Sequence, residues 1–470
     1  MASQLRRHVI YICQDFVPKF HLHIHRLEST PKLSSILTTK RHFASTKSAT
    51  KDVASSGRQK LVILGTGWGS YSVLKTINKS LFDVVVVSPR NHFLFTPLLA
   101  STTVGTLEFR SIIEPVRNVG FRQSDHFHLS QAVSLDMDRK VLKCQSVIDE
   151  KMTYDISYDK LVIGVGSMSN TFGVPGVGKH TFFLKEISDA RSIRNRILNN
   201  FEMALHPDLS EEEKRRLLHI VIVGGGPTGV EFGAELYDFV TQDVSRLYKK
   251  EQALVQVSLI EGKKILASFT ERLQKYAEKK IRSRSQMKLI QANVTEVQDD
   301  RVILHDGTVL PCGLVVWSTG LAPRPFVKSL NVDKNKQGQI LTDKHLRVKS
   351  DKNSSVFAVG DCADIEGYSL PCTAQVAERE GRYLAKCLAS LDTKPITEIE
   401  PFKHQNMGML AYVGDYKGVT DTPAVKAQGF HSWIVWRSAY LTRLGSWRLR
   451  MQVPIDWTKT ILFGRDISRF

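Results

Sequence analysis

Cysteine is scarce and scattered in this sequence, which limits the chemistry that thiols can provide. The six cysteines form no Cys-x-x-Cys pair and no Cys/His cluster with the spacing of zinc ligands. We therefore expect no metal site and no thiol relay, and interpret the cysteines as reduced, mostly structural thiols. Their positions are Cys13, Cys144, Cys312, Cys362, Cys372 and Cys387.

Long apolar runs are also missing. No stretch approaches the roughly 20 apolar residues that a transmembrane helix needs, and the nearest candidates are interrupted by Arg437 and Arg443. If the protein meets a membrane, we expect it to lie on the surface. The sequence likewise offers no convincing Ser/His/Asp arrangement for nucleophilic catalysis.

Acidic residues are rare near the N-terminus. Residues 1–50 contain eight Lys or Arg against Asp15 and Glu28, and Ser and Thr become frequent toward the end of the segment. This composition is typical of a transit peptide, and Arg-His-Phe-Ala-Ser at 41–45 is similar to a mitochondrial processing site. A disordered basic arm is the alternative interpretation.

The net charge does not by itself identify a partner. The 470 residues have a formal charge of +18, which suits nucleic acid, an anionic membrane or nucleotide phosphates. No signature of an RNA-binding module occurs, so we do not expect nucleic acid as a partner. The length and the 42% hydrophobic content are those of a globular chain with two or three domains.

A glycine-rich loop follows the first apolar segment. Residues 60–64 predict a strand, the loop Gly65-Thr66-Gly67-Trp68-Gly69-Ser70 comes next, and after a helical pattern residues 81–88 predict a second strand. This order is typical of a dinucleotide-binding βαβ unit, in which glycines let backbone N–H groups approach a pyrophosphate at a helix N-terminus. Ser70 stands where a third glycine is usual, and we expect this small residue still to allow close packing of helix and strand. Ser88-Pro89-Arg90-Asn91 replaces the acidic residue that usually binds the ribose hydroxyls.

A second loop of the same kind makes this interpretation strong. Residues 220–223 predict a buried strand, and Gly-Gly-Gly-Pro-Thr-Gly-Val-Glu-Phe-Gly follows at 224–233. The next predicted strand, 256–260, ends at Glu261, about 32 residues beyond Gly229 instead of the usual ≈20, which a longer helix would explain. A glutamate there would bind a ribose 2′-hydroxyl and repel a 2′-phosphate, which favours NADH over NADPH. An ordinary surface glutamate is the alternative.

Further strands with glycine corners at 160–166, 314–320 and 356–363 imply that one nucleotide domain is inserted in another. The predicted fold class is α/β, with two Rossmann-like dinucleotide-binding domains and a C-terminal amphipathic membrane-anchoring segment. The predicted parts are a transit peptide at 1–50, an FAD-binding domain at 58–175 and 318–400, an NADH-binding domain at 176–317, and a membrane-association and quinone-side region at 401–470.

From residue 60 to the end, the sequence resembles the type II NADH:quinone oxidoreductases, the alternative NADH dehydrogenases of mitochondria, within the two-dinucleotide-binding flavoprotein superfamily. The motifs that support the resemblance are residues 90–99 (Arg-Asn-His-Phe-Leu-Phe-Thr-Pro-Leu-Leu), 170–176 (Asn-Thr-Phe-Gly-Val-Pro-Gly), 226–232, 373–377 (Thr-Ala-Gln-Val-Ala) and the ending 463–466 (Phe-Gly-Arg-Asp).

The resemblance implies a cofactor, a substrate and the residues that hold them. The expected contacts of non-covalent FAD are Gly65, Gly67, Trp68, Gly69, Ser70, Arg90, Thr96, Pro97, Asp361 and Ala374. The expected contacts of NADH are Gly224, Gly226, Pro227, Thr228, Gly229, Glu231, Glu261 and Gly320. Glu231 would lie near the nicotinamide and the flavin and assist proton transfer, and the alternative is a carboxylate that only stabilises a helix N-terminus.

The quinone motif departs from the family pattern. It normally reads Ala-Gln-x-x-x-Gln, whereas here Gln375 is followed by Arg379 at the second glutamine position. Both are expected quinone contacts. An obligate charge makes a buried pocket costlier unless an acid such as Glu378 or Glu380 pairs with it.

The C-terminal region is aromatic and basic. Between 430 and 470 the sequence interleaves Trp433, Trp436, Tyr440, Trp447 and Trp457 with Arg437, Arg443, Arg448, Arg450 and Lys459. This pattern is typical of a helix that lies in the membrane plane, and a packed helix with a dimer face is the alternative.

The resulting functional prediction is an enzyme: non-proton-pumping oxidation of NADH by FAD with electron transfer to ubiquinone. The expected location is the matrix side of the mitochondrial inner membrane, as a peripheral protein and a homodimer. Two alternatives stay open, a reductase of a soluble protein acceptor and a flavoprotein of the apoptosis-inducing-factor type.

Overall fold

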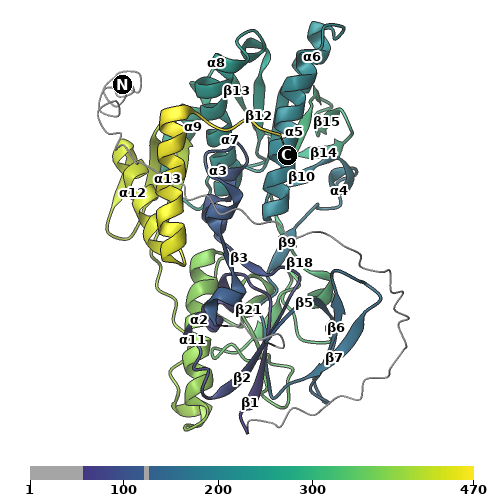
Figure 1. The fold of residues 1–470 in the computed structure, drawn as a ribbon, viewed down its shortest axis with the longest axis vertical. Helices are drawn as coiled ribbons and strands as arrows, with labels where there is room; N and C mark the ends of the chain where they lie inside the picture. The colour runs from purple at the N-terminus through teal and green to yellow at the C-terminus, as the bar shows by residue number, and fades with distance from the viewer. Residues whose placement is uncertain (1–56, 121–125, 470) are drawn as a thin grey trace, which may run out of the picture. The chain divides into compact units, whose positions relative to one another are not determined.

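The structure is a computed structural model that describes residues 57–120 and 126–469. The predicted transit peptide and Cys13 lie outside the described residues. In the part that is described, two sheets dominate the architecture, and Figure 1 shows them one above the other.

The first sheet has seven strands, of which five are parallel and two continue antiparallel at one edge. The inner strands are near-continuous runs of buried Val, Ile and Leu, as expected for strands covered on both faces. In spatial order the strands are β20 (Val356–Ala358), β8 (Lys160–Ile163), β1 (Gln59–Leu64), β2 (Phe82–Ser88), β5 (Phe127–Asp136), β6 (Val141–Ser146) and β7 (Thr153–Ser157).

The second sheet has five parallel strands. In spatial order these are β10 (Phe182–Phe183), β17 (Leu314–Trp317), β11 (His219–Val223), β12 (Gln256–Ile260) and β13 (Met287–Ile290). The chain passes from the first sheet to the second through β9 (Ser167–Ser169) and returns through β18 (Leu321–Pro323), and these two strands pair with each other. Because the strands of the second sheet lie between β8 and β20 in sequence, one sheet is inserted within the other.

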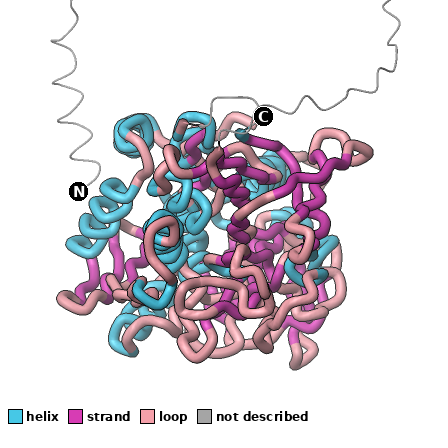
Figure 2. The backbone as a smooth tube through the Cα atoms, turned by 90° about the horizontal axis from the view of Figure 1, so that it is seen from below, coloured by secondary structure: helices cyan, strands magenta, loops and turns pink. Residues whose placement is uncertain are grey.

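Each of the two sheets has helices packed near it. Seen from below, the helices gather mainly on one side of the described part (Figure 2). The helices of the first sheet include α2 (Trp68–Thr76) and α11 (Ala374–Ser390), which pack closely together. Those near the second sheet are α3 (Leu99–Thr102), α5 (Ile187–Ala204), α6 (Glu211–Leu217), α7 (Pro227–Phe239), α8 (Ser245–Leu247) and α9 (Glu271–Arg282). A π-helical turn, η5 (Val240–Val244), continues α7 into α8, which confirms that a longer helical segment precedes β12.

The C-terminal part forms a layer against α7. The antiparallel strands β22 (Met409–Gly414), β23 (Lys417–Asp421) and β24 (Lys426–Gly429) lead into helices α12 (Phe430–Arg443) and α13 (Trp447–Phe463). Strand β22 packs on α7, and α12 packs on β22 and β23. The core is therefore continuous from the second sheet through α7 to Trp436 and Trp457.

The remaining strands and α-helices are short. They are β3 (His92–Leu94), β4 (Ile113–Pro115), α4 (Val177–His180), β14 (Val294–Val297), β15 (Arg301–Leu304), β16 (Val309–Pro311), α10 (Pro325–Ser329), β19 (Ile340–Thr342) and β21 (Ala363–Ile365). No helix of residues 57–120 and 126–469 combines the length and the low polarity needed to cross a bilayer.

Candidate active site

The first glycine loop connects the end of β1 with the N-terminus of α2. Gly65 has a positive φ of 93°, and a Cβ atom there would lie 2.5 Å from the carbonyl oxygen of Gly164. Only glycine fits that position without strain. Gly67 caps α2, so the positive end of the helix dipole faces the space beyond the loop. This geometry suits a phosphate group.

That space is a cavity of about 1080 Å³, just above the range of roughly 300–1,000 Å³ that is usual for pockets of small organic ligands. Eleven of the predicted site residues line it: Gly65, Gly67, Trp68, Gly69, Arg90, Thr96, Thr228, Glu231, Gly320, Asp361 and Ala374. The cavity therefore brings together residues from both glycine-loop units. The predicted residues that are not part of its lining are Ser70, Pro97, Gly224, Gly226, Pro227, Gly229, Glu261, Gln375 and Arg379.

Ser70 faces the sheet. Its hydroxyl donates to the carbonyl oxygens of Leu64 at 2.8 Å and Gly164 at 3.2 Å, and the side chain is fully buried. The expectation that Ser70 permits close packing of helix and strand agrees with this geometry. Its expected direct contact with FAD does not, because the hydroxyl is used in joining α2 to β1 and β8.

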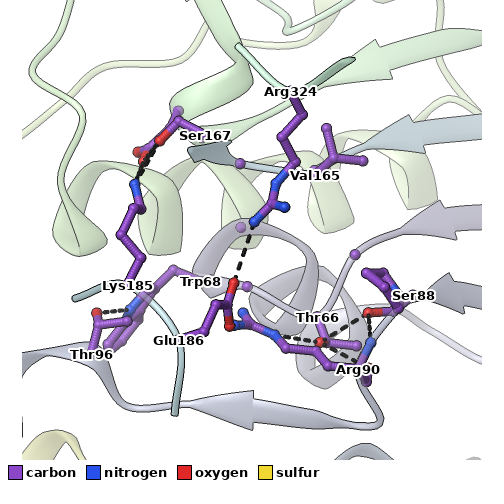
Figure 3. Close-up of a pocket in the computed structure, with 18 of the residues that line it drawn as sticks. Thr66, Trp68, Ser88, Arg90, Thr96, Val165, Ser167, Lys185, Glu186 and Arg324 are labelled. Atoms are coloured by element: carbon purple, nitrogen blue, oxygen red, sulfur yellow. Dashed lines mark hydrogen bonds and ion pairs between the residues drawn. The ribbon is translucent and has the colours of Figure 1, made fainter. Parts of the chain in front are cut away.

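A row of alternating charges lies across the cavity (Figure 3). The Glu186 carboxylate pairs with Arg90 through one oxygen and with Arg324 at 3.3 Å through the other. Glu186 also caps α5 by accepting from a backbone N–H of its first turn. The end of β2, which has no acidic residue of its own, thus has a carboxylate beside it. Sequence reasoning missed Glu186 because nothing local connects it with Arg90, 96 residues earlier.

Lys185 was also missed. Its ammonium donates to the Ser167 hydroxyl at 2.9 Å and lies 3.9 Å from the Asp361 carboxylate, which accepts a hydrogen bond from the same hydroxyl. Burial lowers the pKa of Lys185, and the charge of Asp361 opposes that change. Figure 3 shows the side chain reaching toward Ser167 from the segment that precedes α5. Asp361 is therefore held in place by a hydroxyl and a cation.

The aromatic side of the cavity is built around Trp68. Its indole N–H donates to the Thr96 hydroxyl at 2.9 Å, and its ring packs edge-on against Phe93 and tilted against Phe95. Trp68 and Thr96, both predicted to contact FAD, are thus in direct contact with each other. Phe93 and Phe95 are buried behind Trp68 and fix the orientation of its ring.

The second glycine loop lies between β11 and α7. Gly224 has a φ of 113°, and the N–H of Gly225 donates to Glu261 at 2.8 Å. The other oxygen of Glu261 accepts from the backbone N–H of Lys263 at 2.9 Å. Glu261 lies in a separate groove of about 190 Å³ that Lys263 and Lys264 also line. The strand end thus holds the carboxylate in a fixed orientation beside the loop.

Glu231 is the buried acid of this site. It lies on α7, is 8% exposed, and its Oε1 accepts hydrogen bonds from the Tyr412 backbone N–H and the Trp436 indole N–H, both at 3.1 Å. Burial raises the pKa of Glu231 to about 8, although both hydrogen bonds favour the charged form. The carboxyl group is therefore poised to hold a proton near neutral pH.

Two predicted quinone contacts lie outside the cavity. The Gln375 amide bonds the 407–408 backbone, accepting from Met407 at 2.8 Å and donating to Gly408 at 3.3 Å. Arg379 is partly buried and bonds Gln405 at 3.5 Å.

The acids expected to pair with Arg379 are engaged elsewhere. Glu378 pairs with Arg382, one turn later on the same helix, and Glu380 accepts from the Gly360 N–H at 2.6 Å. Neither acid therefore meets the condition under which a buried charge at position 379 would be compensated. Because the Arg379 side chain is partly exposed, water can solvate its charge.

The aromatic tail divides into inward and outward residues. Trp436 and Trp457 are buried, and the guanidinium of Arg437 lies between the rings of Trp433 and Trp457, 4.2 and 4.3 Å from their centroids. Trp436 and Trp457 thus contribute to packing, as in the packed-helix alternative, and are not available to a membrane surface. Trp447, by contrast, is 77% exposed.

Thiols and metal ligands contribute little to the site. Cys144, Cys312, Cys362 and Cys387 are buried and unpaired, and burial raises the pKa of the first three to about 12. Cys372 is exposed and lines the cavity. Within the described ranges there is no group of three or more His, Cys, Asp or Glu side chains that could hold a metal ion.

Comparison with known proteins gives consistent matches. The model of the pyridine nucleotide-disulphide oxidoreductase family matches residues 59–381, and that of the NDH2 C-terminal domain matches residues 406–466. The chain is 47% identical over 416 residues to a probable NADH dehydrogenase of Dictyostelium discoideum, covering 88% of this chain and 91% of the relative. It is 43% identical over 474 residues to a mitochondrial internal alternative NAD(P)H-ubiquinone oxidoreductase of Solanum tuberosum, covering 94% and 95%.

A solved structure is also similar. NDH2 from Plasmodium falciparum in complex with NADH superposes with a TM-score of 0.83 at 27% identity, covering 87% of this chain and all of that one.

Proposed function

Because the chain belongs to the pyridine nucleotide-disulphide oxidoreductases, and within them to the alternative NAD(P)H-ubiquinone oxidoreductases, we propose that it oxidises NADH through bound FAD and passes the electrons to ubiquinone without pumping protons. The observation that carries the proposal is the shared cavity. It joins the first glycine loop to Thr228 and Glu231 on the helix of the second loop, so two dinucleotides can meet there.

The residues present fit FAD. The cavity is large enough, Gly65 permits close backbone approach, and the N-terminus of α2 offers a positive pole for the pyrophosphate. Asp361 would hold the ribityl region, while Trp68, Thr96 and Pro97 would lie beside the ring system. When bound, FAD supplies the hydride and electron chemistry.

The protein's own residues would position the donor and handle protons. The loop Gly224–Gly229 would bind the pyrophosphate of NADH, with Gly320 nearby, and Glu261, fixed by two backbone N–H groups, would accept from the ribose hydroxyls. Glu231 would hold a proton at the cavity and release it toward the acceptor during quinone reduction. Gln375 and Arg379 would contact the quinone from α11.

We assign the acceptor side to the surface of α12 and α13. Trp447, Met451 and Ile455 recur every four residues on α13 and are 77%, 62% and 52% exposed, which places them in one stripe along the helix. Phe463, at the end of α13, is 73% exposed. An apolar stripe with a terminal aromatic suits insertion into the interfacial layer of a membrane.

The mitochondrial location printed for relatives such as the Solanum tuberosum oxidoreductase supports a mitochondrial location for this protein, and we propose that it lies on the matrix side of the inner membrane. We further propose that the protein is a homodimer. Purified protein is expected to contain non-covalent FAD in a one-to-one ratio and to oxidise NADH with a short-chain ubiquinone. Oxidation that depends on a soluble iron–sulfur protein instead would support the reductase alternative and contradict the proposal.

A further inference from the structure

The hydrogen bonds of Glu231 are unevenly divided between its two oxygens. Both donors, the Tyr412 backbone N–H and the Trp436 indole N–H, reach Oε1. Among the residues that the structure describes, no donor reaches Oε2. An oxygen that accepts two N–H bonds has used its lone pairs. A proton added to this carboxyl group therefore belongs on Oε2, the oxygen left for the cavity that Glu231 lines.

The indole that makes one of these bonds is rigidly held. Trp436 is 3% exposed, and its ring lies 5.5 Å from that of Tyr412 and 5.1 Å from that of Tyr440, centroid to centroid. Tyr440 in turn packs edge-on against Phe95, next to Trp68 on the cavity wall. The direction of the N–H is thus set by aromatic packing that extends from α12 to the first glycine loop.

The groups around Glu231 are acids and phenols. Glu235 lies one turn later on α7, Tyr412 comes from β22, and Tyr440 comes from α12. The charge of Glu235 raises the pKa of Glu231. The cation of Arg465 lies 3.8 Å from Glu235 and therefore pairs with Glu235, not with Glu231. The favourable partners of the Glu231 anion are therefore its two N–H donors, of which one comes from a side chain.

We propose that Trp436 is a positioning residue for Glu231. The indole N–H of Trp436 fixes Oε1 of Glu231, so that the exchangeable proton is carried on Oε2. This bond makes the protonation of Glu231 depend on the position of α12. The inference rests on the proposed NADH:quinone function. Ile434 and Val435, the two residues before Trp436, are each 44% exposed. Helix α12 therefore contacts Glu231 on its inner side while exposing apolar residues on its outer side.

The test is Trp436→Phe, which keeps an aromatic ring and removes the donor. Because the anion loses a hydrogen bond to a charged acceptor, the pH-dependent limb of turnover is expected to move upward by about one pH unit, a roughly tenfold change in proton affinity. The infrared carbonyl band of the protonated carboxyl group, identified by its absence in Glu231→Gln, should titrate at the same higher pH.

Trp433→Phe is the matched control, because Trp433 lies one turn earlier on α12 and packs on Phe430, Tyr416 and Arg437 instead of Glu231. Its profile should coincide with that of the unmodified protein. A Trp436→Phe protein with full flavin content and an unshifted carboxyl titration would overturn the inference.

If Trp436→Phe does not fold, 3-benzothienylalanine at position 436 retains the indole shape without the N–H, and the same shift is expected. The infrared titration needs no quinone, so it separates the two proposals. Failure of ubiquinone to reoxidise the unmodified enzyme would refute the function, whereas an unshifted carboxyl band would refute the role of Trp436.

Discussion

Replacement of Arg465 by Met should lower the stability of the protein, because this arginine bonds the C-terminal segment to η5 and pairs with an acid of α7. The guanidinium donates to Asp243 at 2.8 Å, to Gln242 at 3.1 Å and to the Thr106 hydroxyl at 2.9 Å, and it lies 3.8 Å from Glu235. Its side chain is 4% exposed, and those of Asp243 and Glu235 are 2% and 5% exposed. Water cannot replace the lost partner.

The expected loss follows from this burial. Removing one partner of a buried ion pair typically costs about 3–5 kcal/mol, since the remaining charge is left uncompensated. For roughly 400 described residues, with an unfolding entropy of about 2.1 cal/mol/K per residue, a loss of about 4 kcal/mol lowers Tm by roughly 5 °C. The double variant Arg465→Met/Asp243→Asn should recover part of the loss, because it removes the unpaired carboxylate as well.

Thermal unfolding followed by circular dichroism measures the effect. Arg246→Met is the control, because Arg246 lies 3.8 Å from the same Asp243 carboxylate but is 49% exposed. Pairs with an exposed partner contribute about 0–1 kcal/mol, so this variant should change Tm little. Equal shifts for Arg465→Met and Arg246→Met would refute the reasoning that burial of the cluster determines its contribution.

Three further substitutions test separate parts of the site. Glu231→Gln should lower turnover with NADH and a short-chain quinone more than twofold. It should also abolish the decline in turnover that is expected of the unmodified enzyme as pH rises through about 8. The pKa of Glu231 is raised in the folded state, so the stability that the protonated carboxyl group contributes is lost as pH rises from about 4.5 to 8. Over that window, thermal unfolding of both proteins should show that the Gln variant gains stability relative to the unmodified protein. Glu261→Gln should reduce the preference for NADH over NADPH about tenfold in kcat/KM, since one charge-assisted bond and the repulsion of a 2′-phosphate disappear; an unchanged ratio would remove Glu261 from the ribose site. Gly65→Ala should yield protein without bound flavin, because its Cβ would lie 2.5 Å from the Gly164 carbonyl oxygen, and normal FAD content would contradict the assigned close approach.

Much of the fold could be predicted because its signals are local. The strands at 60–64, 81–88 and 256–260 are continuous apolar runs, and the structure places strands at Gln59–Leu64, Phe82–Ser88 and Gln256–Ile260. The glycine loops follow them directly, so the chemistry of each loop could be inferred from neighbouring residues. The motifs spread along the chain indicated the family, and the family resemblance then identified the two nucleotides as FAD and NADH.

The contacts that complete the site depend on residues far apart in sequence. Glu231 is held by Trp436, 205 residues later, and Arg90 pairs with Glu186, 96 residues later. No periodicity predicts such pairs, because they result from the packing of separate units. The same limit explains the tail, where composition identified an aromatic, basic region but could not distinguish the buried Trp457 from the exposed Trp447.

In the proposed function, NADH reduces the bound flavin and ubiquinone reoxidises it. Anaerobic stopped-flow spectroscopy tests this most directly: NADH is added until the flavin absorbance is bleached, and ubiquinone is then mixed in. The oxidised spectrum is expected to return at a rate no slower than steady-state turnover. A spectrum that stays bleached in the presence of ubiquinone, as in a long-lived complex of reduced flavin with NAD, would contradict it.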